Sequence, residues 1–456
     1  MCGIAGSLAL AAEADPDADW VRVATGRISH RGPDDEGYYA DSDVALGFKR
    51  LAIIDLSPGG HQPMRSADAR YSMIFNGEIY NYVELGEELR KQGVELRSSS
   101  DSEVLLETYA RNRADVVHRL RGMFAFAIWD TWKRELFCAR DPFGIKPFFY
   151  VIEDHGHGPL LRFASERKAL ADAGELRDLD RDALCKYLGF QYVPAPETLT
   201  APVRALPPGH AILARPGGMV RVFRYWRADL RPAPAPVENT AADILAALRD
   251  SVTVHLRSDA PVGAFLSGGI DSAAICALAA EHKPDLVTFT VGFEPKGYSE
   301  IEQAEQIATA LGLESKSYVI TGEEFFADLP RIIWHLDDPM ADAAAVPLWF
   351  VARQASKLVK VALSGEGSDE LFGGYQAYRE RTLVRVSERL PSWGREPLKR
   401  AAALLPSGVK GKASLERMST RLRSRYIGNA HVYRDQQIGA IVRPSPSASD
   451  PVKAAS

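Results

Sequence analysis

The spacing of apolar residues changes across a proline-rich stretch, and this change most constrains how the chain of 456 residues can fold. Before residue 228 the apolar segments are short and separated by turn residues, which is typical of many strands. After residue 240 buried strands alternate with helical segments, which predicts a parallel, doubly wound sheet. The stretch between contains Pro232, Pro234 and Pro236 and is typical of a semi-rigid linker. We therefore predict a domain at 2–227, a linker at 228–240, a second domain at 241–440 and a disordered low-complexity tail at 441–456.

Composition and charge exclude several classes of function. The formal net charge of −5 lacks the basic footprint of a nucleic-acid-binding protein. No apolar run approaches the ~18 residues that cross a bilayer, and the apolar segment after residue 4 lacks the basic region of a signal peptide. The four cysteines, Cys2, Cys138, Cys185 and Cys276, form no CxxC pair, which argues against structural zinc and a disulfide framework. We therefore expect a cytoplasmic protein that binds neither nucleic acid nor membrane.

Local patterns place several elements in the first domain. Tyr71–Phe75 is predicted to be a strand that ends in a tight turn at Asn76-Gly77. An amphipathic pattern predicts a helix from Ile79 to Gln92, and Asp101 is predicted to cap the start of the next helix. A hairpin of buried strands is expected at 124–129 and 135–139.

The first residues carry a chemical possibility of their own. Removal of Met1 would leave Cys2 with both a thiol and a free α-amine. The thiol is the side chain most easily made nucleophilic, and an α-amine has a reference pKa near ~8, so it can act as a base near neutral pH. Cys2 is therefore a candidate nucleophile that supplies its own base, with a frayed terminus as the alternative.

Five motifs then occur in order along the first domain. They are Cys-Gly-Ile at 2–4, Arg-Gly-Pro-Asp at 31–34, Arg-Leu-Ala-Ile at 50–53, Asn-Gly-Glu-Ile-Tyr-Asn at 76–81 and Ala-Arg-Asp-Pro-Phe-Gly-Ile-Lys-Pro at 139–147. Together they resemble the class II glutaminase half of glutamine-hydrolysing asparagine synthetases. The resemblance implies an N-terminal-nucleophile hydrolase domain, an α+β fold built as an αββα sandwich, in which Cys2 forms a γ-glutamyl thioester and releases ammonia.

The polar groups of these motifs match the groups of glutamine. The Arg50 guanidinium is the candidate for the substrate α-carboxylate, because it can bind a carboxylate through two parallel hydrogen bonds. Glu78 and Asp101 are candidates for the α-ammonium, and the Asn76 side chain with the Gly77 backbone N–H for an oxyanion hole. The resemblance assigns the same roles. The alternatives are that Arg50 is an ordinary surface cation and Asp101 only a helix cap.

A glycine-rich loop follows the first buried strand of the second domain. The motif Ser-Gly-Gly-Ile-Asp-Ser at 267–272 opens a predicted helix, where free backbone N–H groups bind phosphate. It is not a Walker loop, since no GxxxxGK[ST] sequence exists in the chain. With Ser-Gly-Glu-Gly-Ser-Asp-Glu at 364–370, it resembles the ATP pyrophosphatase-type synthetase half of the same family, with an α/β doubly wound sheet.

This resemblance implies a site for ATP, Mg²⁺ and an amino-acid substrate. Asp271 and Asp369 would hold Mg²⁺ on the pyrophosphate, a task that suits hard oxygen ligands. Glu366 would lie beside aspartate or its adenylate as a catalytic residue, with a solvated acidic loop as the alternative for Glu366 and Asp369. The residues expected to contact ATP are Leu266, Ser267, Gly268, Gly269, Asp271, Ser272, Val291, Ser364 and Gly365.

The resemblance weakens beyond residue 375. Family members continue past the point where this sequence stops, with a lysine–aspartate–arginine run that is not present here, so we expect a C-terminally incomplete synthetase domain. Three explanations stay open: a second chain completes the domain, the product is impaired, or the acceptor differs. The predicted function is a glutamine-dependent asparagine synthetase with glutamine, aspartate and ATP as substrates, as a homodimer or with a completing chain. The alternatives are an amidotransferase for another carboxylate and a glutaminase-only or regulatory subunit.

Overall fold

The computed structural model describes most of the chain in two compact units. The first comprises 1–179, 194–338 and 343–364, and the second comprises 180–193, 339–342 and 365–456. The predicted linker lies outside the described residues from 230 to 239, and the predicted tail from 443 onward. The residues described are 1–11, 13–154, 156, 158–170, 179–229, 240–294, 299–375, 389–406, 411–421 and the single residues 378, 387, 409, 433, 438, 439, 441 and 442.

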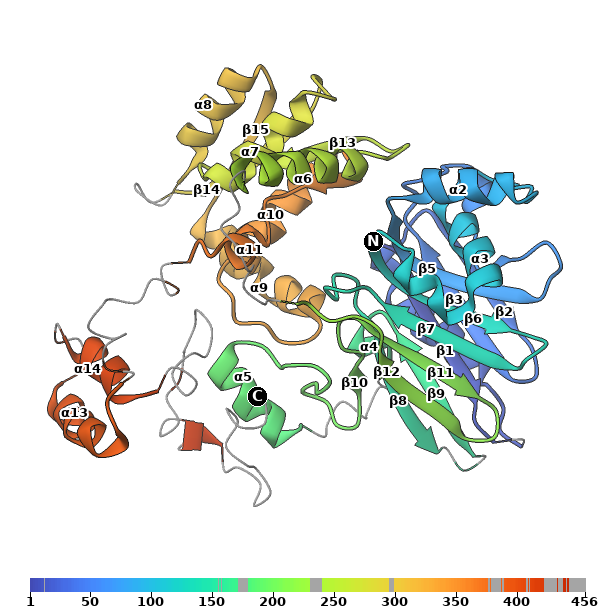
Figure 1. Ribbon diagram of the computed structural model, residues 1–456, viewed down its shortest axis with the longest axis horizontal. Coiled ribbons are helices and arrows are strands. Elements are labelled where there is room, and N and C mark those ends of the chain that lie inside the picture. The colour runs from blue at the N-terminus through green and yellow to red at the C-terminus, as the bar shows by residue number, and fades with distance from the viewer. Residues whose placement is uncertain are drawn as a thin grey trace. The chain divides into compact units, whose positions relative to one another are not determined.

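Two six-stranded antiparallel sheets form the N-terminal part of the first unit (Figure 1, blue to green). One sheet has the order β10-β8-β9-β1-β3-β2, and the other β12-β11-β7-β6-β5-β4. The strands are β1 (Gly3–Ala9), β2 (Asp35–Ala40), β3 (Val44–Arg50), β4 (Met64–Arg65), β5 (Tyr71–Ile79), β6 (Gly122–Asp130), β7 (Glu135–Arg140), β8 (Phe149–Asp154), β9 (Pro159–Ala164), β10 (Arg204–Ala205), β11 (His210–Arg215) and β12 (Met219–Arg224).

Apolar side chains from both sheets meet in one core, and helices cover the outer faces. The inner core joins Ile4 and Phe48 of the first sheet to Trp129 of the second. On one outer face Val21 packs on the first sheet, and on the other Leu105 packs on the second. This is the predicted αββα sandwich, and β1 is buried along its whole length because it lies between a helix layer and the second sheet. The helices are α1 (Ala18–Arg27), α2 (Tyr82–Lys91), α3 (Asp101–Asn112) and α4 (Arg167–Leu170).

Two local predictions in this part are wrong. Asn76 and Gly77 do not form a turn, because β5 runs on to Ile79 and pairs both residues with β6. A Cβ at Gly77 would lie 2.2 Å from the Met123 carbonyl oxygen, so the glycine is required by close approach of the neighbouring strand rather than by a turn. The cap of α3 is Ser100, whose side chain accepts from the Ser102 N–H, and not Asp101.

The C-terminal part of the first unit is built on a parallel sheet with the order β15-β14-β13-β16. Helices cover both faces: Leu278 and Ala304 pack on one face, and Val351 packs against Phe289 on the other. The sheet is therefore doubly wound, as predicted. The elements are α6 (Thr240–His255), β13 (Val262–Phe265), α7 (Ile270–Ala280), β14 (Val287–Phe293), α8 (Ile301–Leu311), β15 (Glu314–Ile320), α9 (Gly322–Leu336), α10 (Ala345–Ala355) and β16 (Val361–Leu363).

The strand order fixes where a ligand site belongs in this sheet. The chain passes from β13 to β14 on one side, and later returns to place β16 on the other side of β13. Such a reversal leaves a crevice at the carboxyl ends of the two strands beside it. The residues that follow β13 and β16 therefore border the expected ligand crevice.

The second unit contains short helices and is described by itself. The Ala341 N–H donates to the Gln191 carbonyl oxygen at 2.8 Å, which connects two of its segments. Its described helices are α5 (Arg181–Phe190), α11 (Ser368–Phe372), α13 (Ser392–Leu404) and α14 (Lys412–Ser419). No helix in the described part of the chain is both long and apolar enough to cross a membrane.

Candidate active sites

Cys2 lies just before β1 and is held by backbone groups. The Leu51 N–H donates to Cys2 Sγ at 3.3 Å, and Sγ lies 3.6 Å from the Leu51 carbonyl oxygen. Burial raises the pKa of the thiol, whereas the terminal ammonium and the Leu51 N–H act to lower it. Burial also lowers the pKa of the Met1 amine to about 5. The Met1 amine is therefore neutral near pH 7.

The edge of β5 offers backbone donors at alternating positions. The Phe75 N–H donates to Gln62 Oε1 at 2.6 Å, and the Ile79 N–H donates to Asp101 Oδ2 at 2.9 Å. Backbone N–H groups two residues apart in a strand point to the same side, so the Gly77 N–H points to this edge between them. Both polar atoms of the Asn76 side chain are buried without a hydrogen-bond partner among the described residues. This arrangement fits an oxyanion hole.

Two interacting carboxyl groups lie near the same edge, that of the buried Asp101 and that of the half-buried Glu78. Burial raises the pKa of Asp101 to about 6, although the N–H groups of Ile79 and Ser102 act against the shift. Burial and the Asp101 charge raise the pKa of Glu78 well above its ordinary value. Glu78 Oε2 is buried without a hydrogen-bond partner among the described residues. A carboxylate pair of this kind needs a cation, and the ammonium group of a substrate would supply one.

Arg50, at the end of β3, is buried and already binds the loop that follows. Its Nη1 donates to the Ser57 carbonyl oxygen at 2.8 Å, and its Nη2 donates to the Asp55 carbonyl oxygen. The alternative of an ordinary surface cation is therefore wrong, since the residue is only 6% exposed. A guanidinium has five N–H donors, so Arg50 can hold this loop and still bind a carboxylate.

Replacing Arg50 with alanine is expected to weaken glutamine binding far more than ATP binding. Loss of charge-assisted hydrogen bonds to a carboxylate costs roughly 1.5–3 kcal/mol, which corresponds to about 10- to 100-fold in the KM for glutamine. Steady-state kinetics with each substrate varied would measure this. Lys49→Ala is the matched control, because Lys49 precedes Arg50 on β3 but pairs with Glu36. Equal effects of Arg50→Ala on both substrates would contradict the assignment.

Three charged residues near Cys2 received no role from the sequence; Arg31 and Lys146 lie within the recognised motifs, and Glu166 lies outside them. Arg31 Nε donates to the Cys2 carbonyl oxygen at 2.9 Å, and its Nη1 lies 2.7 Å from Glu166 Oε1. Burial opposes ionisation of Glu166, but His30 and Arg31 lower its pKa to about 2. Burial lowers the pKa of Lys146, whose charge interacts with Glu78 and Cys2. For Arg31 and Lys146, the signal available in the sequence was a charged residue inside a motif that contains glycine and proline.

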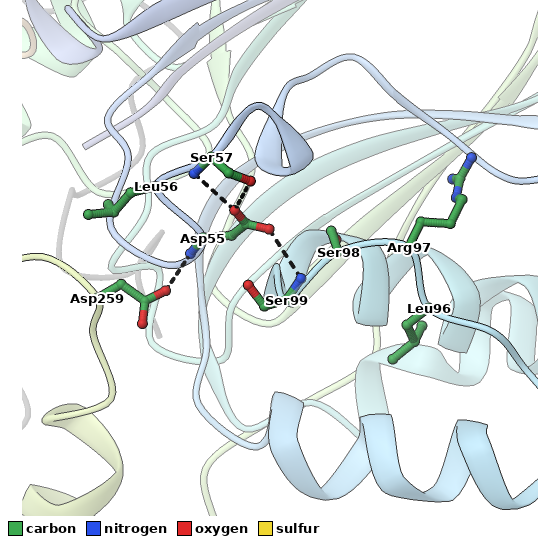
Figure 2. A pocket seen from close by; sticks show the side chains of 8 residues that line it. All are labelled: Asp55, Leu56, Ser57, Leu96, Arg97, Ser98, Ser99 and Asp259. Carbon is green, nitrogen blue, oxygen red and sulfur yellow. Dashed lines mark hydrogen bonds between the residues drawn. The ribbon is translucent and has the colours of Figure 1, made fainter.

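A cavity of about 670 Å³ lies beside this site (Figure 2). Its lining includes none of the predicted glutamine-site residues, but it includes Asp55 and Ser57, whose carbonyl oxygens bind Arg50. Figure 2 shows the Asp55 carboxylate accepting from Ser57 and Ser99 N–H groups, while Asp259 accepts from the Asp55 N–H. The lining residues are Asp55, Leu56, Ser57, Leu96, Arg97, Ser98, Ser99 and Asp259.

The predicted phosphate loop lies between β13 and α7, at the crevice that the strand order defines. Ser267 Oγ and Ser272 Oγ are 2.9 Å apart, and the Gly269 N–H donates to Ser267 Oγ at 3.2 Å. Gly269 caps α7 without a side-chain bond, so the first turn keeps its N–H groups for a ligand. The Gly268 N–H donates to Glu300 Oε2 at 3.1 Å, which shows that a backbone N–H of this loop can bind a carboxylate oxygen.

The other predicted nucleotide residues fall into both units. Leu266 is buried and its N–H donates to the Phe289 carbonyl oxygen at 3.0 Å, whereas Val291 is half-buried on β14. Ser364 directly follows β16 and so borders the same crevice as Ser267. Gly365, Glu366 and Asp369 belong to the second unit, where Glu366 is exposed and Asp369 lies in the first turn of α11.

The donors proposed for Mg²⁺ are carboxylates at helix starts. Asp271 is exposed in the first turn of α7, beside the glycine loop. Among the described residues there is no group of three or more histidine, cysteine or acidic side chains that could hold a metal alone. Mg²⁺ is commonly held by one or two carboxylates together with substrate phosphates, and the exposed Asp271 carboxylate beside the glycine loop suits that mode of binding.

Comparison with known proteins gives two family matches and several relatives that match nearly the whole of this chain. Residues 1–226 match the glutamine amidotransferase domain and residues 243–454 match asparagine synthase. Asparagine synthetase [glutamine-hydrolyzing] 1 of Bacillus subtilis is 48% identical over 95% of this chain and 68% of its own length. A putative asparagine synthetase of Mycobacterium bovis is 46% identical over 97% of this chain and 71% of its own length. A putative asparagine synthetase of Methanocaldococcus jannaschii is 31% identical over 97% of this chain and 88% of its own length.

These matches agree with the geometry in both halves. The amidotransferase match covers the sandwich, in which Cys2 directly precedes the central strand β1, and the synthase match covers the parallel sheet with its glycine loop. The order of the two matches is the order of the two predicted domains. The chain belongs to the family of glutamine-hydrolysing asparagine synthetases.

Proposed function

We propose that this protein converts aspartate, glutamine, ATP and water to asparagine, glutamate, AMP and pyrophosphate. The observation that carries the proposal is the joint presence of Cys2 beside an edge of unpartnered polar groups and a glycine loop at the crevice of a parallel sheet. Each half supplies one part of the reaction. The proposed division at 2–227 and 241–440 assigns glutamine hydrolysis to the first half and adenylation to the second.

In the first half, the Cys2 thiolate attacks the side-chain carbonyl carbon of glutamine. The Asn76 amide, whose polar atoms are buried without a hydrogen-bond partner among the described residues, and the Gly77 N–H stabilise the oxyanion. The amine at the terminus, after removal of Met1, takes the thiol proton and passes it to the leaving ammonia. Water then attacks the γ-glutamyl thioester, which releases glutamate and restores the thiol. Glu78 and Asp101 bind the substrate ammonium, and Arg50 binds its carboxylate.

In the second half, a β-carboxylate oxygen of aspartate attacks the α-phosphorus of ATP, and pyrophosphate leaves. Ammonia then attacks the acyl carbon of the adenylate, and AMP leaves. The loop of Ser267, Gly268, Gly269 and Ser272 holds the pyrophosphate, with Leu266 and Val291 beside the adenine. Mg²⁺, held by Asp271 and Asp369, would neutralise charge on the pyrophosphate. Ser364 and Gly365 contact the nucleotide, and Glu366 lies beside the aspartate.

Pyrophosphate release from Mg·ATP tests the proposal, with ammonia supplied directly so that Cys2 is bypassed. We expect release that depends on aspartate and yields asparagine in equal amount. Assays with glutamate, and without any carboxylate, serve as controls. Release with another carboxylate but not with aspartate would assign a different acceptor. Glutamine hydrolysis without any pyrophosphate release would instead indicate a glutaminase-only or regulatory subunit.

A further inference from the structure

The loop from Arg50 to Asp55 controls the surroundings of the nucleophile. Among the described residues, Leu51 of this loop contacts Cys2 Sγ through both its N–H and its carbonyl oxygen. The next residue, Ala52, donates its N–H to Asp34 Oδ2 at 2.8 Å. The carbonyl oxygen of Asp55 is a partner of the Arg50 guanidinium. A shift of this loop would therefore move a donor at Sγ and the partner of Arg50 together.

Residues of the synthetase half hold this loop at two points, all within the first compact unit. Lys360 Nζ donates to Asp34 Oδ2 at 2.6 Å, so Asp34 joins Lys360 to the Ala52 N–H. Asp259 Oδ2 accepts from the Asp55 N–H at 2.7 Å (Figure 2). Burial opposes ionisation of Asp34, but hydrogen bonds from Lys360 and Ala52 lower its pKa, so the carboxylate is charged at neutral pH.

The backbone adds to the same attachment. The N–H groups of Asp259 and Ala260 donate to the Ile53 carbonyl oxygen at 3.0 and 3.2 Å. The Lys360 N–H donates to the Pro261 carbonyl oxygen at 3.1 Å, which ties the two holding segments to each other. These segments lead directly into β13 and β16, the strands whose other ends border the nucleotide crevice.

We propose that Lys360 and Asp259 are positioning residues for glutamine hydrolysis, although both belong to the synthetase half. They act through the loop at 51–55, which they hold against Cys2 and Arg50, and they touch neither glutamine nor the nucleotide. The proposal rests on the proposed function, because it assumes that Cys2 hydrolyses glutamine. It adds that the glutaminase site is complete only when the start of the parallel sheet is in place.

The test is the double variant Lys360→Met/Asp259→Ala in the full chain. It removes the ion pair and one acceptor while leaving the backbone attachment. We expect kcat/KM for glutamine hydrolysis to fall about 10-fold. Each lost contact is partly exposed and contributes little alone, but the two losses act together on the same loop. Pyrophosphate release with ammonia and aspartate should stay within about twofold of the wild type. Lys360→Arg and Asp259→Asn should each keep near-wild-type hydrolysis, because they preserve a donor and an acceptor.

Asp250→Asn is the matched control, because it breaks another ion pair between the halves, with Arg121, away from this loop. Its glutamine hydrolysis should be unchanged. Unchanged hydrolysis in the double variant would overturn the inference, and so would an equal loss of both activities, which would indicate a merely structural role. A wild-type protein that hydrolyses no glutamine would instead refute the proposed function itself, so the two failures are distinguishable.

Discussion

Replacing Cys2 with alanine is expected to abolish glutamine hydrolysis and to leave ammonia-dependent asparagine formation intact. Alanine keeps the backbone of β1 and removes the only atom that can form the thioester. Loss of a covalent nucleophile lowers kcat by a factor on the order of 10⁴ or more. The second half does not use the thiol, so its rate with added ammonia should change by less than about twofold. Glutamate release and pyrophosphate release, measured on the same preparation, separate the two results.

Cys185→Ala is the control for this experiment, because Cys185 is also a free, partly exposed cysteine but lies on α5. It should hydrolyse glutamine at the wild-type rate. The structure also predicts protection by substrate, since a thiol-specific reagent has to enter the edge that glutamine occupies. Retained glutaminase activity in Cys2→Ala would remove the nucleophile assignment, and with it the proposed source of ammonia.

The parallel sheet was predicted from local patterns in the sequence, whereas the αββα sandwich was expected from the family resemblance. The alternation after residue 240 follows from short apolar strands and capped helices, and the parallel sheet expected there forms. The tight turn at Asn76-Gly77 was wrong because that pair is common in hairpins, whereas here it continues β5. A glycine needed for close approach of a neighbouring strand cannot be told from a turn glycine without the partner strand.

The candidate glutamine site was predicted residue by residue, but its supporting contacts were not. Arg50 is bound to carbonyl oxygens of its own loop, and Glu166 pairs with Arg31 across 135 positions of sequence. Contacts of that separation depend on strand register, which a single sequence does not specify. The same holds for Lys360 and Asp34, which are 326 positions apart. Motifs therefore predicted the groups that we propose to face a substrate, and the fold was needed to find what holds them.

The two halves can be tested separately because their chemistry differs in what it requires. As we propose it, glutamine hydrolysis uses a thiol, an amine and an oxyanion hole, all from the sandwich. Adenylation needs donors for phosphate oxygens at the sheet crevice, where the loop after β13 opens α7. A variant in one crevice should consequently leave the other reaction near the wild-type rate, unless it moves the loop at 51–55. A single substitution in the nucleotide loop should therefore remove ATP turnover and leave glutamine hydrolysis unchanged, the reverse of Cys2→Ala.

Asp271→Asn is expected to remove ATP turnover while sparing glutamine hydrolysis. The change keeps the size of the side chain in the first turn of α7 and removes its negative charge. A lost metal ligand costs several kcal/mol of transition-state stabilisation, so pyrophosphate release should fall on the order of 100-fold or more. Added Mg²⁺ should restore part of the rate if binding of the ion is what was weakened.

Glu302→Gln is the matched control, because Glu302 is an exposed acid in the first turn of α8. This substitution removes the same charge at another helix start. A general effect on the helix dipole would lower the rate of pyrophosphate release alike in both variants, by well under a factor of ten. Only a role at the phosphates predicts a large loss confined to Asp271→Asn, with an altered Mg²⁺ dependence. Unchanged pyrophosphate release in this variant would exclude Asp271 as a ligand, and the metal site would then have to be built from the residues after β16.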